Sequence, residues 1–299
     1  MESSRKIDAL IIGANGLVGG ALAKKLSKCG YRWLGTSCKR ENKNLRKLNI
    51  VNEPEPRLDQ LCSEVLPAAI FHCANLSGGV DLCERQPERA YDFHVKATQL
   101  LGRHAQRTGA IFFFISTDYI FDGSKGDYRE DDSPHPLNVY GMLKLEAEKW
   151  IQENLDRYVI LRTTNVYGWD PETMTPNYVM NLYRCLKEGK TFHAPSYLFG
   201  SPTYAPDLAS AMIELFEKKI TGIFHVVGSD YADRYTWAVQ AAKHLDLEGS
   251  LIKEQIHPAV SIALRPQGVR LNTEKFRNRC VTRLHNLTEG LLLLKDALR

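Results

Sequence analysis

A tyrosine and a lysine stand four residues apart, at Tyr140 and Lys144, in a segment whose pattern predicts a helix. Residues four apart share one helical face, so the two side chains would be neighbours. A phenol is a poor acid near neutral pH unless a nearby cation favours its ionised form. Thr117 lies upstream at the end of an apolar run, and its hydroxyl could donate to a substrate carbonyl. These residues are a candidate general acid with two supporting groups; the alternative is a surface tyrosine beside an extended lysine.

The second chemical signal is a glycine-rich turn with the sequence Gly13-Ala-Asn15-Gly16-Leu-Val-Gly19. It follows the first apolar run, opens a helical pattern and begins a segment with the length of a βαβ unit. Glycines permit a tight turn, close approach of the backbone to a pyrophosphate, and close packing of helix on strand. Exposed N–H groups at the start of the helix would hold the phosphates. The turn therefore predicts a dinucleotide site; an ordinary tight turn is the alternative.

The segment after the second apolar run bears on the choice between the two nicotinamide dinucleotides. NAD sites usually place an acidic residue here to bind the ribose hydroxyls. This chain has Ser37, Lys39 and Arg40 instead. Both cations can pair with a 2′-phosphate, and arginine offers a bidentate fork. We predict NADP(H) as the preferred cofactor and NAD(H) as the second candidate; a solvated basic loop is the alternative.

Apolar runs bounded by turn residues alternate with helical patterns through the first 170 residues. The expected strands are 9–12, 32–36, 69–72, 110–116, 158–162 and 222–227. The expected helices are 17–28, 56–65, 87–108, 140–154 and 207–219. This order indicates βαβ units and a parallel sheet. The fold class we predict is α/β, a doubly wound parallel sheet (Rossmann) with a smaller, partly helical C-terminal substrate lobe.

Prolines interrupt this rhythm after about residue 170, where the connections also lengthen. The helix and the strand expected over 207–227 return the chain to the sheet. We therefore expect a dinucleotide-binding domain of residues 1–168 plus about 200–228. A substrate-binding lobe would comprise about 169–199 plus 229–299.

Composition limits the classes of function. The chain has 299 residues, 43% hydrophobic and 25% charged, which is typical of a globular protein with its own core. Its formal net charge of +4 comes without a basic block interleaved with aromatics, so we expect no nucleic-acid partner. Its seven cysteines include no C-x-x-C pair, which predicts no metal site and favours a reducing, cytoplasmic location. No apolar run approaches the length of a membrane span, so we expect no membrane association.

Longer motifs extend these signals along the chain. The most distinctive is Ser-Thr-Asp-Tyr-Ile-Phe-Asp-Gly at 116–123, followed by Pro-Leu-Asn-Val-Tyr-Gly at 136–141. The remaining motifs are Gly13–Gly19, Arg162–Gly168, Gly-Ser-Pro-Thr-Tyr at 200–204, Asp207-Leu-Ala, and Arg265-Pro266 with Leu271. With these motifs, the chain from about residue 7 to about residue 276 resembles the dTDP-4-dehydrorhamnose reductases, which are extended-like short-chain dehydrogenases.

The resemblance implies reduction of the 4-keto group of a nucleotide-linked deoxysugar by NAD(P)H. It makes Tyr140 the general acid. Lys144 would lower the pKa of this phenol and hold the nicotinamide ribose, and Thr117 would orient the 4-keto oxygen. Asp118 would meet the sugar.

The resemblance also implies a set of cofactor contacts at the ends of the first strands. The residues implied at the pyrophosphate are Gly16, Leu17 and Val18. Those implied beside the nicotinamide are Ala74, Asn75 and Ser77, and those near the adenine are Asn49 and Ile50.

Three positions depart from the family pattern, and all lie where the resemblance places the substrate or the active-site helix. His94 stands where the family has an asparagine, with a core-facing histidine as the alternative. Asn165 replaces a sugar-contacting tryptophan, and Tyr197-Leu198 replaces an Asp-Gln pair. Arg265, in the second lobe, is a candidate clamp for a substrate diphosphate, with a structural salt bridge as the alternative.

Two other functions remain open from the sequence. The first is another nucleotide-sugar epimerase or reductase on the same scaffold. The second is a non-catalytic, NADP-binding regulatory subunit. The reductase family resembles the regulatory subunit of methionine adenosyltransferase, which binds NADP and serves as a partner protein. The expected partners are a nucleotide-sugar substrate and a second copy of the chain in a homodimer.

Overall fold

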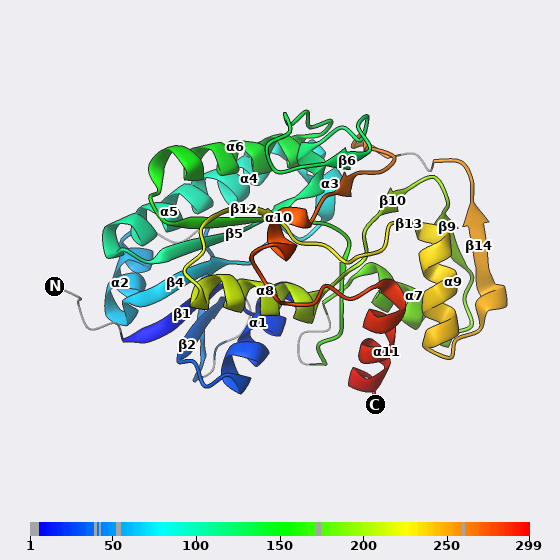
Figure 1. Cartoon of the computed structure of the whole chain (residues 1–299), viewed down its shortest axis with the longest axis horizontal. Helices are drawn as coiled ribbons and strands as arrows, with labels where there is room; N and C mark the ends of the chain where they lie inside the picture. The colour runs from blue at the N-terminus through cyan, green and yellow to red at the C-terminus, as the bar shows by residue number, and fades with distance from the viewer. Residues whose placement is uncertain (1–5, 39–40, 42, 52–54, 172–174, 259–260) are drawn as a thin grey trace.

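The structure is a computed structural model that describes residues 6–38, 41, 43–51, 55–171, 175–258 and 261–299. Within these residues the chain forms a seven-stranded sheet with the order β12-β7-β5-β4-β1-β2-β3 (Figure 1). All neighbouring strands in it run parallel. The strands are β1 (Ile7–Ile12), β2 (Trp33–Ser37), β3 (Leu45–Lys47), β4 (Pro67–His72), β5 (Ile111–Thr117), β7 (Tyr158–Thr163) and β12 (Gly222–His225). The predicted doubly wound parallel sheet is confirmed.

Helices cover both faces of the sheet (Figure 1). On one face lie α2 (Glu55–Val65), α5 (Ala97–Thr108) and α6 (Val139–Asn154), which share a hydrophobic core with the strands. On the other face lie α1 (Leu17–Lys28) and α8 (Ala205–Glu217), with a second core. The short helices α3 (Gly79–Arg85) and α4 (Pro87–Tyr91) precede α5.

Strand β5 shows why the sheet is buried on both faces. Phe112 and Phe114 enter the core under α5 and α6, whereas Ile111 and Phe113 enter the core under α1 and α8. These four side chains are at most 2% exposed. The ring of Phe113 stacks on that of Phe71 at a centroid distance of 4.4 Å. A run without polar alternation therefore fills two cores at once.

The predicted helical segment 87–108 is helical throughout, but it is not one regular α-helix. The chain forms α4, then a π-helical turn η1 (Asp92–Lys96), then α5. A π-turn accommodates one extra residue per turn, which a periodic apolar pattern does not reveal. Sequence reasoning also missed β3 and α3, because three residues and seven residues give too short a pattern.

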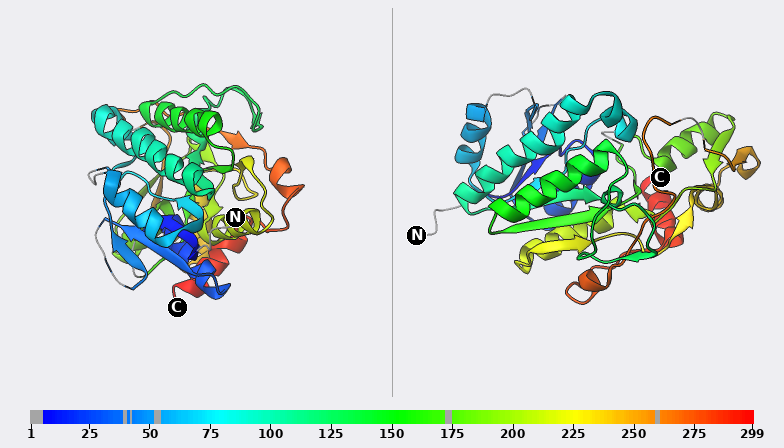
Figure 2. Two further views of the ribbon diagram at one scale, coloured as in Figure 1. Left: turned by 90° about the vertical axis from the view of Figure 1, so that its left-hand side faces the viewer. Right: turned by 90° about the horizontal axis from the view of Figure 1, so that it is seen from above.

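A smaller group of elements lies at one end of the sheet (Figure 2). Its helices are α7 (Tyr178–Lys187), α9 (Arg234–His244) and α11 (Leu287–Ala297). They surround a third core that includes Trp237 and Leu291. Its strand pairs are β9 (Phe192–Pro195) with β14 (Ile252–Gln255), and β10 (Phe199–Gly200) with β13 (Ala232–Asp233). We call these elements the lobe.

Short elements join the lobe to the sheet. They are the pairs β8 (Val166–Tyr167) with β11 (Thr203–Tyr204) and β6 (Asp127–Tyr128) with β15 (Arg270–Leu271), the 3-10 turn η2 (Asp118–Ile120) and α10 (Glu274–Arg277). The 3-10 turn η3 (Gly249–Leu251) lies within the lobe, between α9 and β14. The core on the α1 and α8 face also includes Phe276, Cys280 and Leu284. Part of the segment 229–299, which the sequence predicts to belong to the lobe, therefore packs against the sheet. The two-domain division itself stays a prediction.

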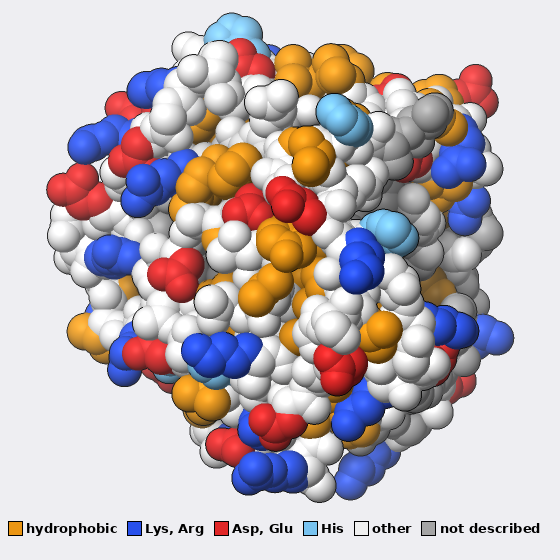
Figure 3. All heavy atoms as spheres, turned by 90° about the vertical axis from the view of Figure 1, so that its right-hand side faces the viewer, with side chains coloured by type: hydrophobic (Ala, Val, Ile, Leu, Met, Phe, Trp, Pro, Cys, Tyr) orange, Lys and Arg blue, Asp and Glu red, His pale blue; other side chains and the backbone are white. Residues whose placement is uncertain are grey.

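The lobe surface seen in Figure 3 carries acidic and basic side chains interspersed with hydrophobic ones. No large region of one sign stands out on that face. In the described part of the chain, none of the helices has both the length and the apolar character that a membrane crossing requires.

Candidate active site

The glycine turn lies at the carboxyl end of β1, where sequence reasoning placed it. Gly13 has a φ of +84°, and a Cβ there would lie 2.7 Å from the Cα of Ala74. A Cβ on Gly19 would lie 2.9 Å from the Cα of Ala14 and would also strike the Gly13 carbonyl. Gly13 is therefore required for the left-handed turn, and Gly19 for the close packing of helix on strand.

Helix α1 begins directly after this turn. Gly16 is its N-cap, and Leu17 and Val18 form its first turn, which contains no acidic residue. The first N–H groups of a helix lack intrahelical partners and carry partial positive charge. Asn15 precedes the cap within the turn. The structure therefore brings the predicted pyrophosphate residues together at a helix N-terminus suited to an anion.

The predicted adenine-side residues lie along β2 and the segment after β3. Ser37 ends β2, and its carbonyl accepts a hydrogen bond of 2.9 Å from Leu48 N–H. Ile50 is 7% exposed, while the Asn49 carboxamide oxygen accepts from Val51 N–H at 3.2 Å. Ser37, Asn49 and Ile50 thus belong to adjoining segments. Lys39 and Arg40, on which the NADP(H) prediction depends, lie outside the described residues.

The predicted nicotinamide-side residues follow β4, the neighbour of β1. Ala74 packs directly against the glycine turn at Gly13. Asn75 and Ser77 are exposed, and the Asn75 side chain accepts from Leu76 N–H at 3.0 Å. Parallel strands end at one edge of a sheet, and that edge is where such folds bind ligands.

Tyr140 and Lys144 lie in the first two turns of α6. The helix begins at an Asn138 cap, whose side chain accepts from Gly141 N–H at 2.8 Å and donates to Leu264 O at 2.9 Å. Thr117 ends β5, which packs against α6, and its hydroxyl favours a lower pKa of the Tyr140 phenol, an effect that burial outweighs. Tyr140, Lys144 and Thr117 are thus brought together, as the sequence predicts.

Lys144 is almost fully buried, with 3% of its surface exposed. Its ammonium donates to Ile115 O at 2.8 Å and lies 4.4 Å from the centroid of the Phe114 ring. Burial lowers the pKa of Lys144 to about 8. Burial, followed by the Asp118 charge, raises the pKa of Tyr140 above its usual value. The net shift of the phenol is upward, so desolvation outweighs the downward effect expected of Lys144.

Asp118 follows Thr117 and is 5% exposed. It accepts a 3.1 Å hydrogen bond from the Thr117 hydroxyl. Burial nevertheless raises the pKa of Asp118 to about 6. A carboxyl group with such a pKa can hold or release a proton near neutral pH.

His94 lies on the π-turn η1 and meets Tyr140 edge to face, with ring centroids 5.3 Å apart. It is 1% exposed, and burial lowers the pKa of His94 to about 2, so its imidazole is neutral. Its Nε2 lies 3.9 Å from Cys83 Sγ. His94 is therefore a core-facing histidine that also contacts the candidate acid. The core position and a place beside the active-site helix are compatible.

Asn165 connects the sheet to the lobe. Its φ is +52°, and its side-chain oxygen accepts a hydrogen bond from the Arg234 guanidinium. Its amide nitrogen lies against Gly200, where a Cβ would clash. Tyr197 and Leu198 precede this glycine, and Leu198 O accepts from Arg234 N–H at 3.0 Å. Two of the departures from the family pattern therefore meet at one arginine.

Arg265 forms an ion pair with Asp81 at 3.0 Å. It also donates to the Ser261 hydroxyl and to Ala263 O. The pairing holds the pKa of Asp81 at about 2. The structural salt bridge, one of the two interpretations of Arg265, is thus present. It occupies several of the N–H donors of the guanidinium.

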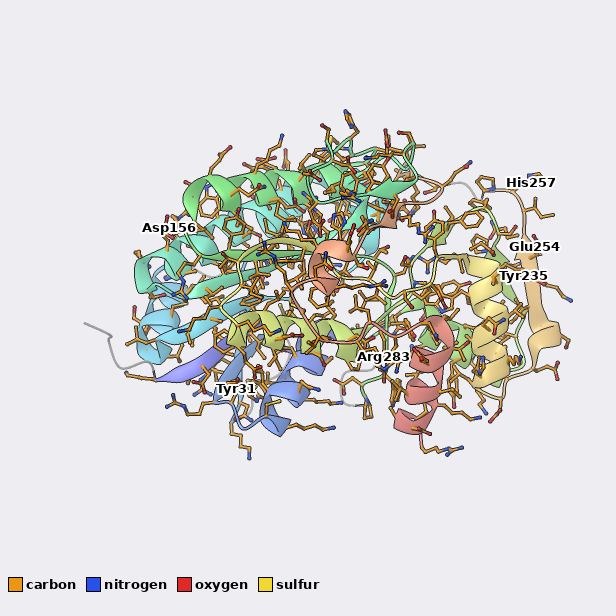
Figure 4. The ribbon with its side chains drawn as sticks, in the orientation of Figure 1. Tyr31, Asp156, Tyr235, Glu254, His257 and Arg283 are labelled. Carbon is orange, nitrogen blue, oxygen red and sulfur yellow. The ribbon has the colours of Figure 1, made fainter. Side chains whose placement is uncertain are left out.

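Sequence reasoning missed Arg234, the first residue of α9. The only local signal is an arginine after the Asp233 cap and before two aromatics, Tyr235 and Trp237. Figure 4 labels Tyr235 in the lobe, at the opposite end of the molecule from Asp156. No local sequence pattern indicates that the first residue of α9 contacts Asn165, which follows β7.

A family model described as the RmlD substrate binding domain matches residues 7–299. The chain is 32% identical over 273 residues to methionine adenosyltransferase 2 subunit beta of Xenopus laevis, covering 89% of this chain and 80% of that one. It is 32% identical over 238 residues to dTDP-4-dehydrorhamnose reductase of Aggregatibacter actinomycetemcomitans, covering 77% and 76%.

A solved dTDP-4-dehydrorhamnose reductase of Bacillus anthracis, in complex with NADP, superposes with a TM-score of 0.86 at 26% identity. The match covers 98% of this chain and 99% of that one. Fold and site thus define a Rossmann-like α/β protein with a Tyr–Lys pair at the carboxyl edge of its sheet. The chain belongs to the RmlD substrate-binding-domain family, as its motifs indicate.

Proposed function

We propose that this protein reduces the 4-keto group of a nucleotide-linked deoxysugar with NADPH as the preferred reductant. The observation that carries the proposal is that Tyr140 and buried Lys144 lie one helical turn apart on α6, with the Lys144 ammonium donating to Ile115 O near the end of β5, the strand that Thr117 completes. A threonine hydroxyl and a phenol placed in this way could bind one substrate oxygen. Relatives named as dTDP-4-dehydrorhamnose reductases support the reaction class.

The residues present fit a nicotinamide dinucleotide. Gly13 and Gly19 leave a cradle that any Cβ would fill, and α1 offers N–H groups free of acidic neighbours. Ala74, Asn75 and Ser77 would flank the nicotinamide, and Lys144 would bind its ribose. When bound, this cofactor supplies a hydride to a carbonyl carbon. The NADP(H) preference rests on Lys39 and Arg40, with Ser37, Asn49 and Ile50 beside the adenosine.

The chain's own groups would position the sugar and deliver the proton. Thr117 would hold the 4-keto oxygen, and Tyr140 would donate its phenolic proton to the emerging alkoxide. The phenol keeps its proton at neutral pH and so has one to donate, although burial raises the pKa of Tyr140 and makes it a weaker acid. Asp118 and Asn165 would contact the sugar from the strand ends.

Replacement of Tyr140 tests this proposal. We expect Tyr140→Phe to lose about a hundredfold or more of kcat on a panel of nucleotide 4-keto-sugars, which is the usual scale of general acid catalysis. The measurement is loss of nicotinamide absorbance, with NADPH affinity determined separately to show that the site is intact. Tyr183→Phe, on α7 in the lobe, is the matched control and should keep wild-type turnover. A Tyr140→Phe enzyme with most of its activity would contradict the assignment.

A second candidate function is regulatory. It is favoured by the identity of 32% over 89% of the chain to a methionine adenosyltransferase 2 beta subunit. In this case the protein would bind a methionine adenosyltransferase catalytic subunit and would have no turnover of its own. Co-purification with that subunit, without NADPH oxidation on any keto-sugar, would favour this role over the reductase.

A further inference from the structure

Arg234 is held firmly at the boundary of lobe and sheet. It begins α9, its N–H donates to Leu198 O at 3.0 Å, and its carbonyl accepts from the Tyr178 hydroxyl at 2.7 Å. Its guanidinium lies 4.7 Å from the Tyr178 ring centroid and 5.0 Å from that of Trp237. The side chain is therefore fixed by two aromatic rings, as arginines used for recognition often are.

The guanidinium uses little of its hydrogen-bonding capacity. It has five N–H donors, and the structure shows one bond, to the side-chain oxygen of Asn165. Asn165 is itself held in a left-handed conformation against Gly200. The other donors of Arg234 remain available to a ligand.

Within the described ranges, no carboxylate lies within ion-pair distance of Arg234. Two other arginines differ in this respect: Arg162 is paired with Glu148 at 2.8 Å and Arg265 with Asp81 at 3.0 Å. Burial lowers the pKa of Arg234 and the Asp118 charge opposes that shift, but these two groups form no ion pair, and an Asp118 oxygen accepts from the Thr117 hydroxyl. A half-buried cation without an ion-pair partner is costly unless a ligand supplies the anion.

We propose that Arg234 binds an anionic oxygen group of the substrate, which is a phosphate of the nucleotide diphosphate or a carboxylate on the sugar. The inference rests on the proposed function and deepens it by assigning the charge of the substrate to a residue. Asn165 holds the guanidinium fork in place. Arg265, the diphosphate clamp suggested by the sequence, is already neutralised by Asp81.

The test is ligand binding to the NADP-loaded protein, measured by calorimetry with dTDP, UDP-glucose and UDP-glucuronate as probes. We expect Arg234→Gln to weaken binding about tenfold or more. A loss for all three probes identifies phosphate as the group bound, whereas a loss confined to UDP-glucuronate identifies the carboxylate. A change of less than threefold for every probe would overturn the inference. So would a wild-type protein that binds none of them.

Two controls separate this result from other causes. Arg277→Gln, on α10, removes the same charge from an exposed site and should leave probe binding unchanged. If Arg234→Gln does not fold, Arg234→Lys keeps the charge but loses the fork, and the same threefold limit applies to it. Because binding needs no turnover, failure of the proposed reductase function appears separately, as absent NADPH oxidation on the keto-sugar panel.

Discussion

The two sides of the site are built in different ways. On the sheet side, the functional groups come from short contiguous motifs, and their charges are satisfied within the chain: Lys144 by a carbonyl, and Arg162 by Glu148. On the lobe side, Asn165 and Arg234 come from segments 69 residues apart, and Arg234 keeps an unneutralised charge. The charged groups of the sheet side are therefore paired within the chain, whereas Arg234 on the lobe side has no ion-pair partner among the described residues. We infer that the first determines the reaction and the second the substrate.

The largest expected effect concerns the ion pair that supports the sheet side. Glu148 lies one turn after Lys144 on α6, and its carboxylate accepts from Arg162 and from the Ser116 hydroxyl. Both partners of the pair are at most 4% exposed. Removing one partner strands a buried charge, so we expect Arg162→Met to lower the free energy of unfolding by about 3–5 kcal/mol. Urea denaturation measures this loss.

The matched control for that variant is Arg129→Met. Arg129 pairs with Glu274 at 3.2 Å, but both side chains are at least 60% exposed. Exposed pairs contribute about 0–1 kcal/mol, so the loss should be small. Equal losses of unfolding free energy for the two variants would show that the buried Arg162–Glu148 pair does not stabilise the sheet side. The contrast between the two sides would then be wrong.

The next effect concerns the glycine turn. A Cβ at Gly19 would strike the Gly13 carbonyl and would lie 2.9 Å from Ala14 Cα, which are backbone atoms that cannot yield cheaply. We expect Gly19→Ala to weaken NADPH binding by about tenfold or more, because the turn must open to admit the methyl group. Nicotinamide fluorescence titration measures the affinity. Gly126→Ala, where a Cβ meets nothing within 4 Å, should bind NADPH as the wild type does.

A smaller effect is expected from pH. Burial lowers the pKa of Lys144 to about 8, so its ammonium is lost as the pH rises through that value. The raised pKa of Tyr140 keeps the phenol protonated over the same range. We therefore expect kcat/KM for reduction to be level below about pH 7 and to fall about tenfold per unit well above pH 8.

Lys144→Arg provides the internal check on this profile. A guanidinium stays charged at every pH used, so the variant, though slower, should lack the alkaline fall. A wild-type profile that stays level to about pH 9.5 would remove Lys144 from the reaction.

The sequence predicts the sheet side well because its signals are local. Gly13–Gly19 and the spacing of Tyr140 and Lys144 depend only on the turn and the helix that contain them. The roles of Lys39 and Arg40 stay predictions, since both lie outside the described residues.

The lobe side was predicted poorly because its contacts are distant in sequence. Nothing near Arg234 indicates that Asn165 meets it, and nothing near Arg265 distinguishes a phosphate ligand from Asp81. The π-turn that presents His94 to Tyr140 also escaped, because one inserted residue leaves the apolar pattern helical.

The most direct measurement is isotope transfer. The protein is incubated with a nucleotide 4-keto-deoxysugar and NADPH carrying deuterium at the transferable position of the nicotinamide, and the product sugar is analysed by NMR. The account predicts deuterium on carbon 4 of the sugar in the wild type and little product from Tyr140→Phe. A product with deuterium at another carbon, or no transfer with any nucleotide 4-keto-sugar, would contradict it.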